Sequence, residues 1–486
     1  MRKLRVGFIE FYRQWPGYFT DTFNAAYAGA LSEAGHDARI FRIFLHERSQ
    51  EVILEAHQAL TAAGPFDVLV FDRVWDGALL RDVVTAAGAP HVLVLQWESS
   101  AQWPEVTARI SPISRDALLA YAEAIATDVA PTSECIPNLF TRDENGAWRP
   151  PKSLVPLEIK RELRAPLTLG HDRAAHFGLP EEAYRRTRYL VLNMGCPYRG
   201  AENTSDFLDG LDLPTSWGAA GCTFCNVGPY ERQRREERLA LMENQLAALA
   251  LHGDYDRLVV QDEYIFRDLD TLVEVVMRHA AAPVEIMVRA RVDYIDSCRD
   301  ALVRALEELG EFGTITPYLV GFENFSDAEL QRYNKGQTRA QSITAAQTLF
   351  ALADRYPNLT LSPSQGFILF GPWTTLDDLD ANIDAFRTLG FNRLRGALTR
   401  SKLRLNPDAA LVARARADGL LIAAYDERSE DNAQETGYQA ELPYRFAHDA
   451  TARVWELLNG PNPTRGESEI DRLARAVTQA RAEAAS

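Results

Sequence analysis

Short apolar runs alternate with helical stretches along most of the chain, and this alternation limits the folds open to it. In the second half six runs have the length and composition of strands, and a helical stretch follows each one. Such alternation predicts a parallel sheet closed into a partial (β/α)6 barrel of the TIM type, with reactive residues at the carboxyl ends of the strands. The predicted strands are residues 189–194, 257–261, 284–288, 314–323, 365–370 and 393–399.

The first third of the chain repeats this alternation on a smaller scale. It predicts a Rossmann-like α/β domain, a parallel sheet with helices on both faces. No glycine-rich phosphate fingerprint follows the first strand, so a dinucleotide is not expected. The predicted strands are 4–9, 38–44, 67–71 and 91–95, and the helices between them are 21–35, 51–63 and 77–87.

Breaks in composition divide the chain into four segments. Residues 141–151 are polar and contain Asn-Gly and Pro-Pro pairs, which favour a turn in a linker. The last 66 residues, 421–486, hold an acidic loop and two helical stretches. We therefore predict a Rossmann-like domain at 1–140, a linker at 141–188, the barrel at 189–420 and a helical C-terminal extension at 421–486.

The charge balance is acidic. Lys and Arg number 52 against 68 Asp and Glu, a net charge of −16, so a nucleic-acid partner is not expected. The densest basic run, 232–238, is interpreted as a solvated helix face. The first residues do not resemble a signal peptide, and no apolar run is long enough to cross a membrane. Five cysteines, an odd number, argue against a disulfide framework and favour a reducing, cytoplasmic setting.

Three of the five cysteines lie between residues 193 and 230, directly after the first strand of the predicted barrel. They are Cys196, Cys222 and Cys225. Three thiolates at one strand exit suit a soft metal or an iron–sulfur cluster, and three protein ligands leave one coordination position open. Cys135 and Cys298 are expected to be packed thiols rather than ligands.

The sequence around these cysteines resembles the cluster loop of radical S-adenosylmethionine (SAM) enzymes. With residues 200–221 removed, the sequence reads GCPYR-CTFC, which is similar to that family's Cys-x3-Cys-x2-Cys loop. The family often has an aromatic residue just before the last cysteine, as Phe224 is here. This chain departs from the pattern, because 25 residues (197–221) separate Cys196 from Cys222.

Further stretches at the predicted strand ends also resemble this family. The passage GFEN at 321–324, followed by NKG at 334–336, is similar to the family's glycine-aromatic-Glu stretch and its Lys-Gly sequel. The resemblance implies that an acidic pair after the second strand meets the SAM ammonium. It also implies that an arginine after the third strand binds the SAM carboxylate. The residues that it places at the cofactors are Phe224, Tyr230, Asp262, Glu263, Arg289, Arg291, Gly321, Glu323, Asn324 and Phe367.

Two residues are candidates for a catalytic role. They are Glu323, at the end of the fourth predicted strand, and Trp217, in the insertion that splits the cysteine loop. Each predicted site residue could instead have a purely structural role. The acidic residues could cap helices, and the arginines could pair with surface carboxylates.

The resemblance implies an enzyme that binds a 4Fe-4S cluster and SAM and takes electrons from a flavodoxin- or ferredoxin-type donor. The first domain resembles, in its order along the chain, the cobalamin-binding domain of one subgroup. Cobalamin is therefore compatible with it, and methyl transfer would make the enzyme a transferase. The aromatic residues near its strand ends either face a macrocycle or pack between domains; these are Tyr12, Trp15, Trp75 and Trp97.

Alternatives remain open at this stage. Within the class, the substrate is expected to be a small molecule or a peptide, with a tRNA-modifying enzyme as the rival. Outside the class, the chain would be a non-catalytic α/β protein in which Cys222 and Cys225 bind a structural metal such as zinc.

Overall fold

A computed structural model describes most of the chain. The described residues are 2–12, 20–45, 50–72, 77–95, 103–163, 173–200, 206–213, 221–225, 227–228, 230–251, 253, 255–362, 365–391, 401–406, 409–422, 442–460 and 467–486. Within them, no helix is long and apolar enough to cross a membrane.

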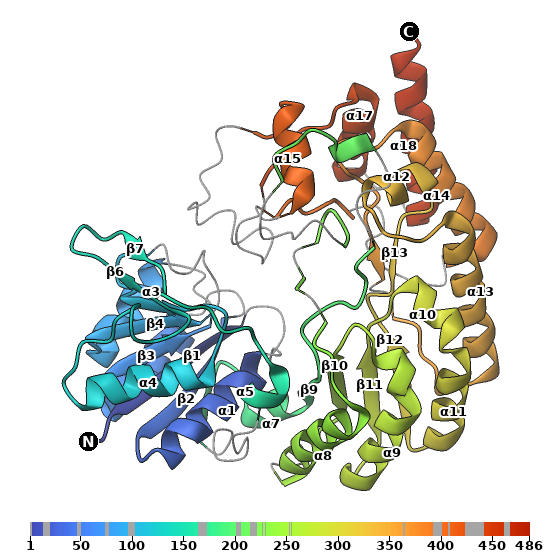
Figure 1. Cartoon of the computed structure of the whole chain (residues 1–486). Coiled ribbons are helices and arrows are strands. Elements are labelled where there is room, and N and C mark those ends of the chain that lie inside the picture. Colours follow the sequence, from blue (N-terminus) through green and yellow to red (C-terminus); the bar gives the residue numbers. More distant parts are fainter. Residues whose placement is uncertain are drawn as a thin grey trace.

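The first part of the chain forms an eight-stranded sheet, drawn in blue to teal in Figure 1. Its strand order is β7-β6-β5-β4-β3-β1-β2-β8, and its neighbouring strands are parallel except in the pairs β5–β6 and β6–β7. The central strands are buried along their length, as the continuous apolar runs predict. The strands are β1 (Arg5–Tyr12), β2 (Asp37–Phe44), β3 (Val68–Phe71), β4 (His91–Leu95), β5 (Ala108–Ile110), β6 (Leu139–Arg142), β7 (Trp148–Arg149) and β8 (Ala174–Phe177).

Helices cover this sheet, and the predicted Rossmann-like arrangement is confirmed. The predicted elements at 77–87 and 91–95 match the observed ones at both ends, and the others differ by a few residues. Strand β8 lies in this sheet beside β2 although it belongs to the predicted linker. The segment boundaries themselves stay a prediction. The helices are α1 (Thr20–Glu33), α2 (Gln50–Ala63), α3 (Gly77–Ala87), α4 (Arg115–Ala126), α5 (Ile159–Glu162) and α7 (Glu181–Arg185).

The second part of the chain forms the predicted partial barrel. Four parallel strands pair in the order β12-β11-β10-β9, and β13 pairs with β14 in parallel. The predicted strands 257–261 and 284–288 match β10 and β11, whereas the last predicted strand, 393–399, lies outside the described residues. The strands are β9 (Thr187–Val191), β10 (Arg257–Gln261), β11 (Val284–Val288), β12 (Gly313–Pro317), β13 (Gly321–Glu323) and β14 (Gly366–Phe367).

The predicted fourth strand, 314–323, is wrong as a single element. It forms two strands, β12 and β13, with Leu319 between them at φ +51°. A left-handed residue interrupts extended backbone, so the chain turns before β13 begins.

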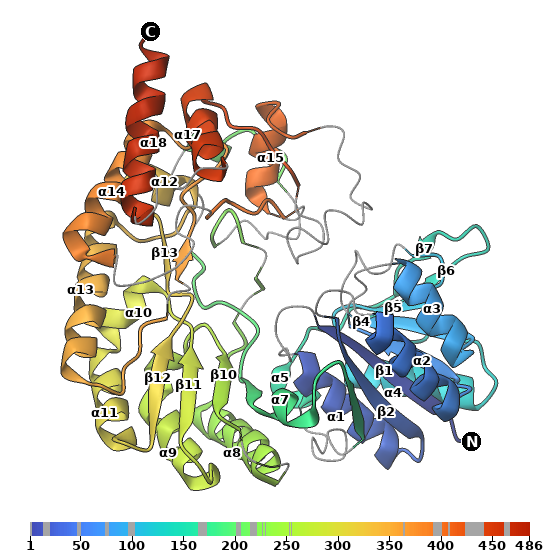
Figure 2. The same cartoon turned by 180° about the vertical axis from the view of Figure 1, so that it is seen from behind.

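Helices line the outer side of the barrel strands (Figures 1 and 2). The C-terminal helices α17 and α18 pack on each other, and α18 packs on α14. The two termini lie at opposite ends of the molecule (Figure 1). The elements are η3 (Asp206–Leu208), α8 (Arg235–Leu251), η5 (Ile265–Asp268), α9 (Leu269–His279), α10 (Val292–Ser297), α11 (Arg299–Leu309), α12 (Asp327–Arg332), α13 (Arg339–Arg355), α14 (Leu376–Leu389), α15 (Ala410–Ala417), α17 (Asp449–Asn459) and α18 (Glu469–Ala484).

Direct contacts join the two sheets. The hydroxyl of Thr22, on α1, donates to the carbonyl oxygen of Tyr189, on β9, over 3.2 Å. The backbone N–H of Ile159 donates to Glu231 Oε2 over 2.6 Å. Because Glu231 closely follows the cysteine loop, the segment between the sheets is tied to the predicted site.

Candidate active site

The cysteine loop starts at the carboxyl end of β9, and its two halves lie beside each other. The backbone N–H of Cys196 donates to the carbonyl oxygen of Gly228 over 3.0 Å, which joins the start of the loop to its end. The N–H of Gly221 points at the carbonyl oxygen of Gly200 over 3.5 Å, so the two ends of the insertion meet. The insertion therefore leaves the strand exit and returns to it.

The three predicted ligand thiols lie close enough for their charges to interact. Burial raises the pKa of Cys225 to about 12, and the charges of Cys222 and Cys196 add to the rise. Burial also raises the pKa of Cys196, on which the charge of Cys222 acts too. The thiols fit an anionic site that a bound cation or cluster would stabilise, because metal ligation deprotonates thiols.

The spacing of these thiols bears on what they can hold. Among the described residues, no three His, Cys, Asp or Glu side chains converge closely enough to hold a single metal ion. A 4Fe-4S cluster needs less convergence, because each thiolate binds a different iron atom. Three cysteines from one loop are ligands of the kind that a 4Fe-4S cluster takes.

Arg291 follows β11 and lies beside the thiols. Its Nε donates to Asp293 Oδ1 and its Nη2 to the carbonyl oxygen of Lys335, each over 2.9 Å. Its guanidinium carbon lies 4.1 Å from the ring centroid of Tyr198, two residues after Cys196. The side chain is buried, and Nη1 has no hydrogen-bond partner among the described residues. An unpaired cationic donor at this place suits an anion.

Glu323 forms a buried ion pair with Lys335. Lys335 Nζ donates to Glu323 Oε1 over 2.6 Å. A Cβ atom at Gly321 would lie 2.8 Å from that oxygen and 2.9 Å from the Lys335 nitrogen, so the ion pair lies directly against the backbone of Gly321. Glu323 itself has φ +58°. The carboxylate predicted to be catalytic is thus held by a lysine, and its catalytic role stays a prediction.

Glu263 and Arg289 pair at the neighbouring strand ends. Arg289 Nη1 donates to Glu263 Oε1 over 3.3 Å, and Arg289 Nε donates to the hydroxyl of Tyr318 over 2.9 Å. Both charged side chains keep about a quarter of their surface exposed, 24% for Glu263 and 27% for Arg289. They are accessible to a ligand at the edge of the sheet where the thiols lie.

Asp262, the other member of the predicted acidic pair, is fully buried. It forms an ion pair with Arg238 on α8, whose Nε also pairs with Asp268 over 2.7 Å. Arg238 donates to the Tyr230 hydroxyl as well, over 3.0 Å. The interpretation of 232–238 as a solvated face is therefore wrong at Arg238. Both Asp262 and Tyr230 thus already have protein partners. Their contact with a cofactor stays a prediction.

The remaining predicted cofactor residues lie at or under the same edge. Asn324 is fully buried: its Nδ2 donates to the carbonyl oxygen of Ile368, and its Oδ1 accepts from Asn382. Phe367 stacks on Phe322 with a centroid distance of 5.5 Å in an aromatic cluster. Phe224 lies between Cys222 and Cys225 and contacts Tyr333 edge-on at 5.5 Å. Cofactor contact by Asn324, Phe367 and Phe224 stays a prediction.

Three residues at this site were not predicted from the sequence. Tyr198 and Lys335 belong to the GCPYR and NKG motifs, so the motifs themselves could have indicated them. Tyr294 packs on Tyr264 with a centroid distance of 4.4 Å, and no sequence signal marks it.

Several predicted residues have other outcomes. Trp217, Trp15, Trp75 and Trp97 lie outside the described residues. Tyr12 is buried, donates to Glu10 Oε2 over 2.7 Å and packs edge-on against a second tyrosine, so it has the packing role rather than an exposed one.

The two other cysteines, Cys135 and Cys298, differ in their exposure to solvent. Cys135 is exposed, so its prediction as a packed thiol is wrong, whereas Cys298 is half-buried against the core. The difference at Cys135 arises because it lies in a turn at the surface.

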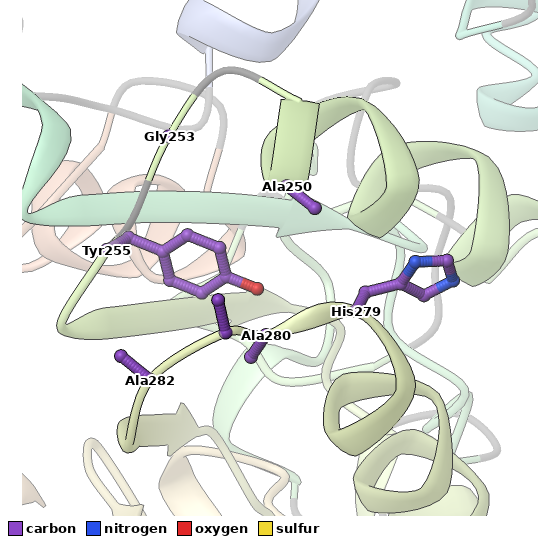
Figure 3. Close-up of a pocket in the computed structure, with 7 residues that line it drawn as sticks. Ala250, Gly253, Tyr255, His279, Ala280 and Ala282 are labelled. Carbon is purple, nitrogen blue, oxygen red and sulfur yellow. The ribbon is translucent and has the colours of Figure 1, made fainter.

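A small pocket lies at the opposite end of the barrel strands. Figure 3 shows it between the ends of α8 and α9, before β10 and β11 begin, lined by Tyr255, His279 and small residues. Its volume of about 20 Å³ is near that of one water molecule. Its place away from the strand exits and its size argue against a substrate site.

Comparison with solved structures gives matches over nearly the whole chain, among them the following two enzymes. The cobalamin-dependent SAM radical enzyme OxsB, with aqua-cobalamin and SAM bound, aligns with a TM-score of 0.63 and 13% identity, covering 98% of this chain and 70% of that one. The radical SAM methyltransferase TsrM from Kitasatospora setae, with tryptophan and aza-SAM bound, aligns with a TM-score of 0.57 and 16% identity, covering 99% and 95%. No protein-family model matches the sequence, and no curated protein matches it significantly. The chain therefore has the fold of cobalamin-dependent radical SAM enzymes, an α/β sheet domain followed by a partial barrel.

Proposed function

We propose that this chain is a radical SAM enzyme that holds a 4Fe-4S cluster on Cys196, Cys222 and Cys225. The observation that carries the proposal is that the backbone of the loop's two ends comes together near the carboxyl end of β9, although 25 residues separate Cys196 from Cys222. Parallel strands bring their carboxyl ends to one edge, so charged residues after β10 and β11 are available beside them.

The charged residues at this edge suit the amino-acid part of SAM. Glu263 offers a carboxylate for its ammonium group, and Arg289 offers a guanidinium for its carboxylate. The two side chains already pair at 3.3 Å, so each orients the other. A zwitterionic ligand would replace one salt bridge by two. The chemistry of a cluster with bound SAM is one-electron cleavage of the sulfonium, and that of cobalamin is transfer of a methyl group.

Cobalamin-dependent methyl transfer is the leading reaction under this proposal. It is supported by the fold, since OxsB binds cobalamin and TsrM is a methyltransferase. The residues after β3 and β4 that would border a macrocycle lie outside the described part of the chain. The net charge of −16 favours a small-molecule or peptide substrate over tRNA.

The proposal also includes the surroundings of the enzyme. A flavodoxin- or ferredoxin-type protein would supply the electron. None of the five cysteines, all of which are described, forms a disulfide; this suits a reducing compartment, and we place the enzyme in the cytoplasm.

The test is SAM cleavage without a substrate. The chain is reconstituted anaerobically with iron and sulfide, reduced with dithionite and given SAM with and without cobalamin, and the products are identified by mass spectrometry. We expect 5′-deoxyadenosine or S-adenosylhomocysteine from the wild type and neither from Cys222→Ala. A chain that binds zinc and leaves SAM intact would support a structural metal site instead.

A further inference from the structure

The split cysteine loop needs a device that keeps its halves together. We propose that Arg291, Asn334 and Lys335 form a clamp that holds the two halves as one site before any cluster binds. The inference rests on the proposed function, because it assigns positioning roles at the proposed cluster site. The first half is residues 196–200 and the second half is residues 221–225.

The second half is fixed to the backbone that carries the clamp. The Nδ2 of Asn334 donates to the carbonyl oxygen of Gly221 over 2.8 Å. Thr223 is fully buried, and its N–H donates to the carbonyl oxygen of Tyr333 over 3.0 Å. Its hydroxyl donates to the carbonyl oxygen of Arg332 over 2.6 Å. Three hydrogen bonds therefore align this half with the turn after α12.

Ring contacts add to these hydrogen bonds. Lys335 Nζ lies 5.7 Å from the ring centroid of Phe224, and the Tyr333 ring meets that ring edge-on. Phe224 lies between two of the predicted ligands, so its place limits the place of both thiols.

The first half is fixed through Tyr198. The Arg291 guanidinium lies over the Tyr198 ring at 4.1 Å from its centroid. A Cβ atom at Gly336 would lie 2.3 Å from the Tyr198 hydroxyl oxygen, so the ring rests against the backbone of Gly336. Gly336 has φ +68°, and glycine supplies both this conformation and the space.

The two contact sets are joined to each other. The Nη2 of Arg291 donates to the carbonyl oxygen of Lys335 over 2.9 Å, so the residue that holds the first half also holds the segment that binds the second. Arg291 also forms a β-bridge with Gly321, next to the Glu323–Lys335 ion pair. Arg291, Glu323 and Lys335 are all buried. Together they connect the ends of β11 and β13 to both halves of the loop.

The length of the insertion explains why such a clamp is needed. Its short helix η3 packs on elements outside the loop: Phe207 meets Trp373 edge-on at 4.8 Å, and Leu208 lies in a cluster with residues of α15. A longer connection between two ligands costs more entropy to close than the three residues of the family's loop. Contacts from outside the loop therefore add to the direct contact between Gly221 and Gly200 in holding the halves together.

The test measures the distance between the halves without iron. A chain with Cys135→Ser, Cys225→Ser and Cys298→Ser keeps only Cys196 and Cys222. Dibromobimane, which becomes fluorescent when it joins two thiols, is added to this metal-free chain, and the rate of intramolecular crosslinking is measured.

Two clamp variants and two matched controls are made in that background. Asn334→Asp keeps the size of the side chain and its tolerance of φ +44° but removes the donor to Gly221. Its control is Asn358→Asp, whose amide donates to backbone carbonyls at a distant site. Arg291→Gln removes the stacked guanidinium, and its control is Arg267→Gln, which removes an exposed cation 5.7 Å from the Tyr264 ring centroid.

We expect crosslinking to slow about tenfold in both clamp variants, the loss typical of residues that orient metal ligands, and to keep its rate in both controls. Unchanged crosslinking in clamp variants with wild-type circular dichroism would overturn the inference. Asn334→Gly, which suits the left-handed backbone, repeats the test if Asn334→Asp does not fold. A metal-free chain that crosslinks as expected but takes up no cluster in its wild-type form would contradict the proposed function and leave the clamp standing.

Discussion

Replacing Lys335 by methionine should destabilise the barrel by about 3 kcal/mol. The Lys335 Nζ–Glu323 Oε1 distance is 2.6 Å, and the two side chains are only 7% and 11% exposed. At an effective dielectric constant of about 20, two charges this close attract by about 6 kcal/mol, and desolvation offsets part of this. Removing one partner of a buried pair costs about 3–5 kcal/mol, and the partial exposure of Glu323 favours the lower end.

Calorimetry of the metal-free chain measures this cost. For a cooperative unit of this size, a loss of about 3 kcal/mol lowers the unfolding temperature by about 6–12 °C. Glu323→Gln should give a similar loss, because it leaves the lysine buried without its partner. The double variant, Glu323→Gln with Lys335→Met, should lose less than either single one, since no unpaired charge remains. Single variants that unfold within about 2 °C of the wild type would refute this reasoning.

Three further predictions concern single side chains. Glu263→Gln should weaken SAM binding to the reconstituted chain about 10- to 100-fold by calorimetry, the loss of one charge-assisted contact, while changing stability by less than about 1 kcal/mol. Burial alone would raise the pKa of Asp378, but hydrogen bonds from Ser326 and Thr375 hold it below its usual value. Asp378 therefore stabilises the fold above about pH 4 and loses this effect as the pH falls further, so Asp378→Asn should flatten the acid limb of a pH–stability curve. Tyr255→Phe should leave the unfolding temperature nearly unchanged, because the buried Tyr255 hydroxyl has no hydrogen-bond partner among the described residues.

Much of the architecture could be predicted because its strands are continuous apolar runs. Strands β10, β11 and β4 and helix α3 match their predicted bounds at both ends. Alternation then requires parallel strands, and parallel strands place their exits at one edge. The edge strand β8 was not predicted, because a short strand of mixed composition in a polar segment carries little periodicity.

The candidate site could be predicted in its location more than in its contacts. Order along the chain indicated that the two ends of the insertion between Cys196 and Cys222 return to one strand exit, as the backbone contact of Gly221 with Gly200 shows. The sequence could not show that Asp262 is buried in an ion pair whereas Glu263 stays partly exposed. The partner of Asp262 is Arg238, which lies on a helix 24 positions earlier in the chain. Nor could it reveal that Lys335 holds Glu323, a pairing that depends on the turn between α12 and α13.

The most direct measurement is electron paramagnetic resonance of the anaerobically reconstituted and reduced chain, with and without SAM. Cys196→Ala and Cys225→Ala are measured in parallel. We predict a 4Fe-4S signal that shifts when SAM is added to the wild type and is lost in both variants. A full signal that survives Cys196→Ala, or no cluster in a wild-type chain that binds zinc, would contradict the claim that the split loop forms one cluster site.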